Sequence, residues 1–159
     1  MVDSNENMNK ICSLYVSDWH LITMLIPYLK EKLEKGIKIE TFFERSLKEN
    51  INTLLKKIIL NQENKDKITS INWNKTIICN EHIENKLMNT SIAIVAGSDE
   101  YIKIINKIID KSKKNITIIN CFEVSQYNEN IKEILKNHKF ILNTSGEKKI
   151  EDVFETYVS

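Results

Sequence analysis

Glycine and proline are scarce in this chain of 159 residues, which holds three glycines and one proline. Flexible linkers and low-complexity segments are rich in such residues, so the composition predicts neither. No apolar run reaches the roughly 18 to 20 residues of a membrane span, and the first ten residues are too polar for a signal peptide. We expect one cytoplasmic domain over residues 10–159, preceded by a disordered or frayed segment at 1–9.

Arginine is rare, and Arg45 is the only one in the chain. The formal net charge is +1. Proteins that read nucleic acids or phosphate groups usually carry several guanidinium groups on a basic surface. A nearly neutral mixture of charges also gives little attraction to an anionic membrane. The sequence therefore predicts no direct nucleic-acid partner and no membrane partner.

The three cysteines, Cys12, Cys79 and Cys121, are an odd number and lie in apolar, strand-like runs. Such positions are typical of buried, reduced thiols rather than of a disulfide framework. We expect all three to be buried.

Short apolar runs alternate with segments of helical spacing along the chain. The runs predict strands at 11–16, 37–43, 75–79, 91–96, 115–122 and 139–143. Strict alternation of strand and helix predicts βαβ units. The expected fold class is α/β, with three layers, a mainly parallel sheet of about six strands, and helices on both faces, as in Rossmann-like and RecA-like folds.

The first predicted helix begins at Ser17 and Asp18, which suit a helix N-terminus, and ends at Gly36. Pro27 falls inside it and predicts a kink or a break into two pieces.

Ser46 and Glu49 have the spacing of a capping box at the start of the next helix. The polar segment 61–67 that follows is predicted to be a surface loop. Further helices are expected at 81–88, from Asp99 onward, at 129–137 and from Glu147 onward.

Motifs that bind phosphate groups are absent, because neither a glycine-rich loop ending in Lys-Ser or Lys-Thr nor a dinucleotide fingerprint occurs. Gly97 and Ser98 stand at a predicted helix start, where an anion could bind. Asp99 and Glu100 follow directly and would repel it. We therefore favour a plain turn there and expect no cofactor.

The sequence gives only weak indications of a metal site or a catalytic site. Cys79 and His82 form the one close pair of metal-ligand type, whereas a zinc site usually needs more ligands. Cys121 and His138 follow neighbouring strands and could approach as a nucleophile and base, but a buried cysteine and a helix-ending histidine are the commoner explanation. Glu123 after a strand is an isolated carboxylate. We expect no metal and no enzyme activity.

Ligands of parallel α/β sheets bind beyond the carboxyl ends of the strands. The residues that follow the predicted strands form a candidate rim at 17–20, 44–46, 80–82, 97–99 and 123–126. Tyr15, Trp19 and His20 cluster at the first strand–helix junction. They could form the wall of an apolar pocket or simply pack under the first loop, and the sequence favours neither.

Both ends of the chain resemble the MEDS domain, the sensory module of methanogen and methylotroph proteins and of a dichloromethane-responsive regulator. The segments 13–15, 25–29 and 33–36 are similar to its opening. The segments 120–123, 134–135 and 140–142, with His138 and Gly146, look like its closing strand end, helix, histidine and strand. Lys10 stands where the family often has a histidine.

The resemblance implies a RecA-like or KaiC-like scaffold without a phosphate-binding loop. It also implies a sensory domain that detects a small, apolar molecule and signals to a separate protein, such as a histidine kinase or a transcription regulator.

We therefore expect a stand-alone, non-catalytic sensory domain. Its predicted ligand-binding residues are Tyr15, Trp19, His20, Cys121, Glu123 and His138. One alternative is a degenerate nucleotide-binding, ATPase-like protein or small enzyme. Another is a pure protein-interaction module that works as a homodimer.

Overall fold

One mainly parallel sheet of six strands forms the centre of the protein, in the order β2-β3-β4-β1-β5-β6. The computed structural model describes residues 10–112, 115–123, 131–143 and 146–149, and gives only the backbone at 131–132. Within these residues the strands are β1 (Lys10–Tyr15), β2 (Ile39–Phe43), β3 (Ile92–Ala96), β4 (Thr117–Glu123), β5 (Phe140–Asn143) and β6 (Gly146–Lys149). The first five run parallel and β6 runs antiparallel to β5.

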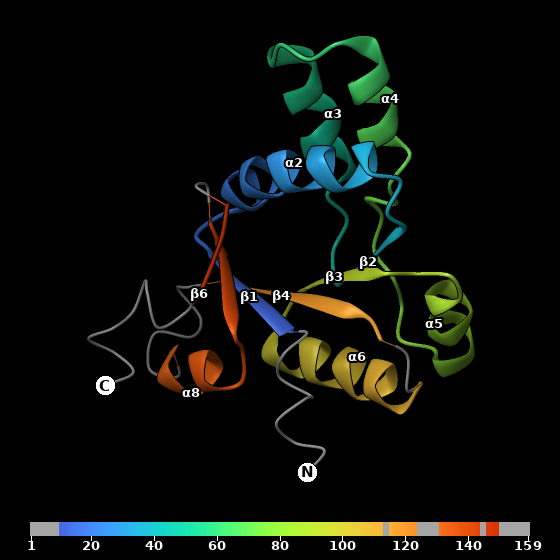
Figure 1. Cartoon of the computed structure of the whole chain (residues 1–159), viewed down its shortest axis with the longest axis vertical. Helices are drawn as coiled ribbons and strands as arrows, with labels where there is room; N and C mark the ends of the chain where they lie inside the picture. Colours follow the sequence, from blue (N-terminus) through green and yellow to red (C-terminus); the bar gives the residue numbers. More distant parts are fainter. Residues whose placement is uncertain (1–9, 113–114, 124–130, 144–145, 150–159) are drawn as a thin grey trace.

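Helices cover both faces of the sheet and complete three layers (Figure 1). The described helices are α2 (Asp18–Glu34), α3 (Lys48–Lys57), α4 (Gln62–Thr69), α5 (Asn80–Leu87), α6 (Asp99–Lys111) and α8 (Ile131–Lys136). The first three lie on one face, and α5, α6 and α8 lie on the other. The predicted fold class is confirmed.

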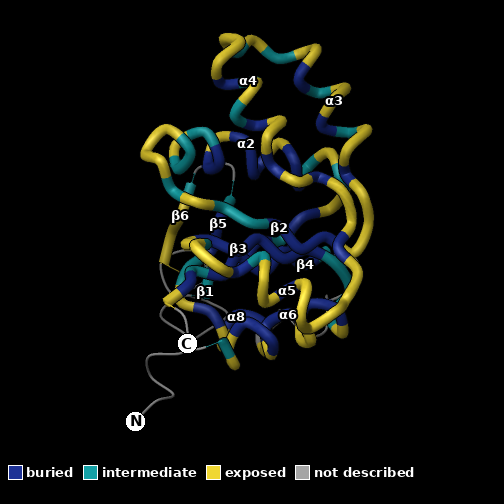
Figure 2. Tube along the Cα trace, turned by 90° about the vertical axis from the view of Figure 1, so that its right-hand side faces the viewer, coloured by how far each residue is buried: buried dark blue, intermediate teal, exposed yellow. Residues whose placement is uncertain are grey.

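Two hydrophobic cores fill the spaces between the layers, and the buried strands separate them (Figure 2). Side chains of a strand alternate between its two faces. Accordingly Cys121 of β4 packs in the α2-side core, whereas Ile118 and Phe122 of the same strand pack in the α6-side core. This alternation decides which residues can meet at a site.

Helix α2 begins where the sequence predicts. The Ser17 hydroxyl accepts a hydrogen bond from the backbone N–H of His20 at 3.1 Å, and Asp18 lies at the positive end of the helix dipole. The helix runs unbroken through Pro27, so the predicted break is absent. Gly36 follows with φ of +74°, a conformation that glycine adopts without strain.

The predicted loop at 61–67 is instead the helix α4. The Asn61 side chain accepts a hydrogen bond from the Asn64 N–H at 2.7 Å and caps the helix. Ile68 is fully buried and, with Asn64, gives the helix one inward face. The other positions are polar because they face water, and this polar composition is the reason why the sequence predicted a loop.

The predicted strand at 75–79 is also wrong. The segment makes only an isolated bridge between Lys75 and Phe43, and its Ile77 side chain is 72% exposed. Cys79 is exposed as well, so the prediction of three buried thiols holds only for Cys12 and Cys121. Runs of β-branched residues are typical of buried strands, but this run forms no strand of the sheet.

Two other predictions about helices are wrong, one on a helix cap and one on the segment that begins at Glu147. Helix α3 starts at Lys48 with Leu47 as its N-cap, so Ser46 and Glu49 form no capping box. Residues 147–149, predicted as the start of a helix, belong to β6 because they pair with β5. The segments 1–9 and 150–159, and the first residues of the predicted helix at 129–137, lie outside the described residues.

No helix within the described part of the chain combines the length and the apolar character that crossing a bilayer requires.

Candidate functional site

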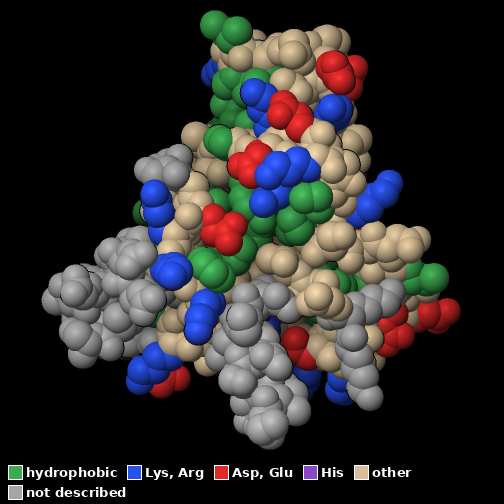
Figure 3. Space-filling view, in the orientation of Figure 1, with side chains coloured by type: hydrophobic (Ala, Val, Ile, Leu, Met, Phe, Trp, Pro, Cys, Tyr) green, Lys and Arg blue, Asp and Glu red, His purple; other side chains and the backbone are tan. Residues whose placement is uncertain are grey.

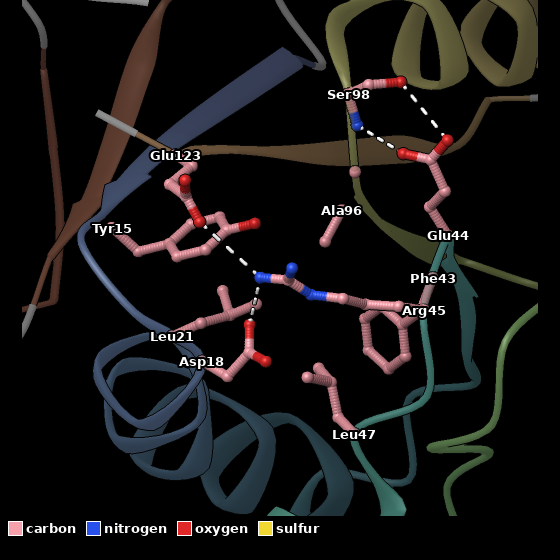
Figure 4. A pocket seen from close by; sticks show the side chains of 11 residues that line it. Tyr15, Asp18, Leu21, Phe43, Glu44, Arg45, Leu47, Ala96, Ser98 and Glu123 are labelled. Carbon is pink, nitrogen blue, oxygen red and sulfur yellow. Dashed lines mark hydrogen bonds and ion pairs between the residues drawn. The ribbon is translucent and has the colours of Figure 1, made fainter. Parts of the chain in front are cut away.

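A cavity of about 260 Å³ lies at the carboxyl ends of β1 to β4 (Figure 4). The connection after β1 leads to α2 on one face of the sheet, and the connection after β3 leads to α6 on the other. Connections that diverge in this way leave a crevice between them, where α/β proteins bind ligands. The volume is close to the lower end of the roughly 300 to 1,000 Å³ of small-molecule pockets.

Apolar side chains form the inner wall of this cavity. Tyr15 from β1, Leu21 from α2, Phe43 from β2 and Leu47 at the start of α3 all line it, and each is at least nine-tenths buried. Figure 3 shows apolar side chains framed by acidic and basic ones in the area of α2 and the sheet. The wall therefore offers an apolar surface to a small ligand.

A charged bridge lies across the cavity. One terminal nitrogen of Arg45, Nη2, lies 2.6 Å from Asp18 Oδ1 and 3.5 Å from Glu123 Oε2. The hydrogen bond to Asp18 is the main cause of the raised pKa of Arg45. Because the Arg45 side chain is 61% exposed, the bridge contributes about 1 kcal/mol or less to stability. It links the ends of β1, β2 and β4.

The N-terminus of α6 lies beside the cavity and already binds a carboxylate of the protein itself. The Glu44 carboxylate accepts hydrogen bonds from the Ser98 backbone N–H at 2.6 Å and from the Ser98 hydroxyl at 3.3 Å. At Gly97 an added Cβ would lie 2.7 Å from the Cβ of Glu44 and 2.9 Å from Tyr101 Cδ2. Glycine is therefore required for this close approach, and the turn that could bind an anion holds Glu44.

The Tyr15 hydroxyl faces the cavity without a hydrogen-bond partner among the described residues. The residue as a whole is 4% exposed. Figure 4 shows it directed into the cavity, near Arg45 and Glu123. Burial raises the pKa of the phenol, so the hydroxyl keeps its proton and can donate. The described residues contain no buried side-chain nitrogen or oxygen that lacks a hydrogen-bond partner, so this hydroxyl is accessible from the cavity, where a ligand atom could bond to it.

Of the six predicted site residues, the structure places Tyr15 and Glu123 at this cavity. Trp19 and His20 lie in the first turn of α2 but do not line it. Trp19 is 46% exposed, and the His20 Nδ1 accepts a hydrogen bond from the Val16 N–H at 3.0 Å.

Cys121 and His138 lie on opposite faces of the sheet, so they do not approach as a nucleophile and base, which was the less favoured of the two explanations. Cys121 is sealed in the α2-side core, where burial raises the pKa of its thiol. His138 packs edge-on against Phe122, a member of the other core. It lines a second cavity of about 660 Å³ between α6 and α8.

A closed hydrogen-bond network fixes the state of His138. The amide nitrogen of Asn120 donates to Nε2 of His138 at 3.0 Å and to the amide oxygen of Asn106, also at 3.0 Å. An amide nitrogen cannot accept, so the histidine proton is on Nδ1, which donates to the Ile134 carbonyl at 2.6 Å. Burial lowers the pKa of His138 to about 4. The ring is thus a neutral structural element.

The list of predicted site residues lacked five residues that line the cavity, namely Asp18, Glu44, Arg45, Gly97 and Ser98. All five come within three residues of a strand end and belong to the predicted rim. The position after a strand was therefore the signal that identified them. Within the described residues, no group of three or more His, Cys, Asp and Glu side chains is arranged to hold a metal ion.

Comparison with models of known protein families and with curated proteins finds no match to this chain.

Proposed function

We propose that this chain is a non-catalytic sensory or regulatory domain that binds a small molecule in the cavity at the carboxyl ends of β1 to β4. The observation that carries the proposal is the Tyr15 hydroxyl, which belongs to a largely buried side chain, is directed into the cavity and has no described hydrogen-bond partner. A ligand that accepts or donates one hydrogen bond there would gain about 0.5 to 1.5 kcal/mol.

The chemistry of the cavity favours binding over catalysis. Its titratable side chains are three carboxylates, one guanidinium and one phenol, and none forms the nucleophile–base pair of a hydrolase or transferase. The Cys121 thiol is enclosed in the core below. The nucleotide-binding alternative is not favoured, because the Glu44 carboxylate holds the Ser98 amide that a phosphate group would need.

A ligand in this cavity would contact the connections that follow β1, β2 and β3 together. Binding would favour one arrangement of these connections and so change the surface offered to another protein. We propose that this partner is a separate signalling protein, such as a histidine kinase or a transcription regulator, as the resemblance to the MEDS domain implies. Self-association as a homodimer is the alternative way to transmit the change.

Native mass spectrometry of the purified protein tests the proposal, with a denatured sample as the control. We expect a mass excess in the wild-type protein that disappears on denaturation. Tyr15→Phe removes only the hydroxyl and should lower the occupied fraction, through a loss of affinity of about 2-fold to 10-fold. Trp19→Ala alters an exposed side chain outside the cavity and should leave the occupied fraction unchanged.

The unfolding free energy separates a ligand contact from a structural role. Because the Tyr15 hydroxyl makes no hydrogen bond with the described residues, Tyr15→Phe should not lower the stability of the ligand-free protein. An equal mass excess in Tyr15→Phe and in the wild type, or none in either, would contradict the proposal.

A further inference from the structure

We infer that the ligand of this cavity is a small organic cation whose charged group takes the place of Arg45 between Asp18 and Glu123. The inference rests on the proposed function and adds to it the chemical class of the ligand and the first step of the response. The cavity, its charge and its apolar wall support it independently.

The charges that line the cavity favour a cation. Three carboxylates, Asp18, Glu44 and Glu123, face one guanidinium, so the lining carries a formal net charge of −2. Glu44 is engaged by Ser98, and Asp18 and Glu123 both pair with Arg45. An anionic ligand would meet repulsion at this wall, whereas a cation would be attracted to it.

Arg45 is held in a way that permits replacement. Both of its described ion pairs use the same nitrogen, Nη2, so the guanidinium forms no two-pronged pair with either carboxylate. Its side chain is 61% exposed, whereas those of Asp18 and Glu123 are 26% and 19% exposed. The two carboxylates are therefore more buried than the cation between them, and the guanidinium can turn outward into water.

A primary ammonium group fits the place that Arg45 Nη2 occupies. It has three N–H donors, and three oxygen-bearing groups surround the place, namely the carboxylates of Asp18 and Glu123 and the hydroxyl of Tyr15 (Figure 4). The apolar side chains of Leu21 and Phe43 lie beside it and can cover a short hydrocarbon body. A volume of about 260 Å³ limits that body to a few carbon atoms.

Release of Arg45 gives the binding event a structural consequence. In the ligand-free protein Arg45 ties the connection after β2 to Asp18 at the start of α2 and to Glu123 at the end of β4. When the ammonium group takes over both carboxylates, the Arg45 side chain joins the surface and that tie is lost. The exchange of one cation for another leaves the net charge at the two carboxylates unchanged.

Titrations with three probes of similar size but different charge test the inference, monitored by two-dimensional ¹H–¹⁵N NMR spectra. We expect n-butylammonium chloride to shift the amide signals of Tyr15, Asp18 and Gly97. 1-Butanol should bind at least about tenfold more weakly, and sodium butanoate should not bind at these amides.

Three substitutions at the cavity and one control away from it test whether n-butylammonium binds between Asp18 and Glu123. Asp18→Asn and Glu123→Gln should each lower the affinity for n-butylammonium at least about tenfold, while the affinity for 1-butanol changes less than about twofold. Arg45→Met removes the internal competitor and should raise the n-butylammonium affinity about fivefold or more. Lys103→Met also removes one cation and one ion pair, but away from the cavity, and should have no effect beyond about twofold.

The outcomes separate the inference from the proposed function. Equal binding of 1-butanol and n-butylammonium at this cavity would overturn the inference and leave the proposed function standing. A lower n-butylammonium affinity in Arg45→Met, or no shift with any probe, would also overturn it. The mass measurement with Tyr15→Phe, which uses whatever molecule the protein retains, decides the proposed function separately.

Discussion

Lowering the pH should destabilise this protein through one buried side chain, His138. Burial lowers the pKa of His138 to about 4, compared with 6.5 for an unperturbed histidine. Between these two values the unfolded chain binds a proton that the folded protein excludes, so stability falls as the pH falls. The contribution is complete above pH 6.5 and is lost progressively down to pH 4.

The size of the effect follows from that difference. A pKa difference of about 2.5 corresponds to about 3 kcal/mol in total. About 2 kcal/mol of this should be lost between pH 7.5 and pH 5.0, where most carboxyl groups are still ionised. The cause is structural: protonation of Nε2 would place an N–H against the Asn120 amide nitrogen that now donates to it. The nearby Lys10 ammonium lowers the pKa of His138 further.

Urea denaturation at pH 7.5, 6.5, 5.5 and 5.0 measures this loss. His138→Gln removes the titrating group, so its unfolding free energy should be lower at pH 7.5 but nearly independent of pH over this range. His82→Gln makes the same change at an exposed position and should keep the pH dependence of the wild type. If the wild type and His138→Gln lose stability equally between pH 7.5 and 5.0, the assignment of a neutral, buried His138 is refuted.

Two other predictions follow from packing. Gly97→Ala should lower the unfolding free energy by about 1 to 3 kcal/mol in urea denaturation, because the new Cβ would lie 2.7 Å from a neighbouring side-chain carbon. Gly36→Ala should cost about 1 kcal/mol, since nothing lies within 4 Å of its Cβ and only the positive φ opposes it. A smaller loss for Gly97→Ala than for Gly36→Ala would count against the steric argument. In the native protein a chromogenic disulfide reagent should modify one thiol quickly, that of Cys79, because Cys12 and Cys121 are buried and burial raises the pKa of Cys12 to about 12. Fast release of more than one equivalent would show that a buried thiol is accessible.

The central strands could be predicted from the sequence because their environment leaves a clear pattern. All five residues of β3 are buried, and a strand covered on both faces consists of consecutive apolar residues. The segment 75–79 also contains a short run of β-branched residues but lies outside the sheet, so such a run does not by itself identify a strand. Helix α4 was hidden for the opposite reason, since only Asn64 and Ile68 among its eight residues are buried.

The location of the cavity could be predicted, but not all of the side chains that line it. The rule that ligands bind after the carboxyl ends of parallel strands identified Asp18 and Arg45 as rim residues. Asp18 and Leu21 line the cavity, whereas Trp19 and His20, which lie between them in the sequence, do not. The reason is that successive side chains of a helix point about 100° apart. Pairing across the sheet, which puts His138 on the other face, depends on register that one sequence does not reveal.

An NMR screen of the full chain against a library of small fragments shows directly whether this cavity binds ligands. We expect the fragments that bind to shift amide signals clustered at the carboxyl ends of β1 to β4, including those of Tyr15, Arg45 and Gly97. We also expect Tyr15→Phe to lower the affinity for the same fragments. Shifts that cluster instead around His138 in the cavity between α6 and α8, or no specific shifts from any fragment, would contradict the assignment of this cavity as the ligand site.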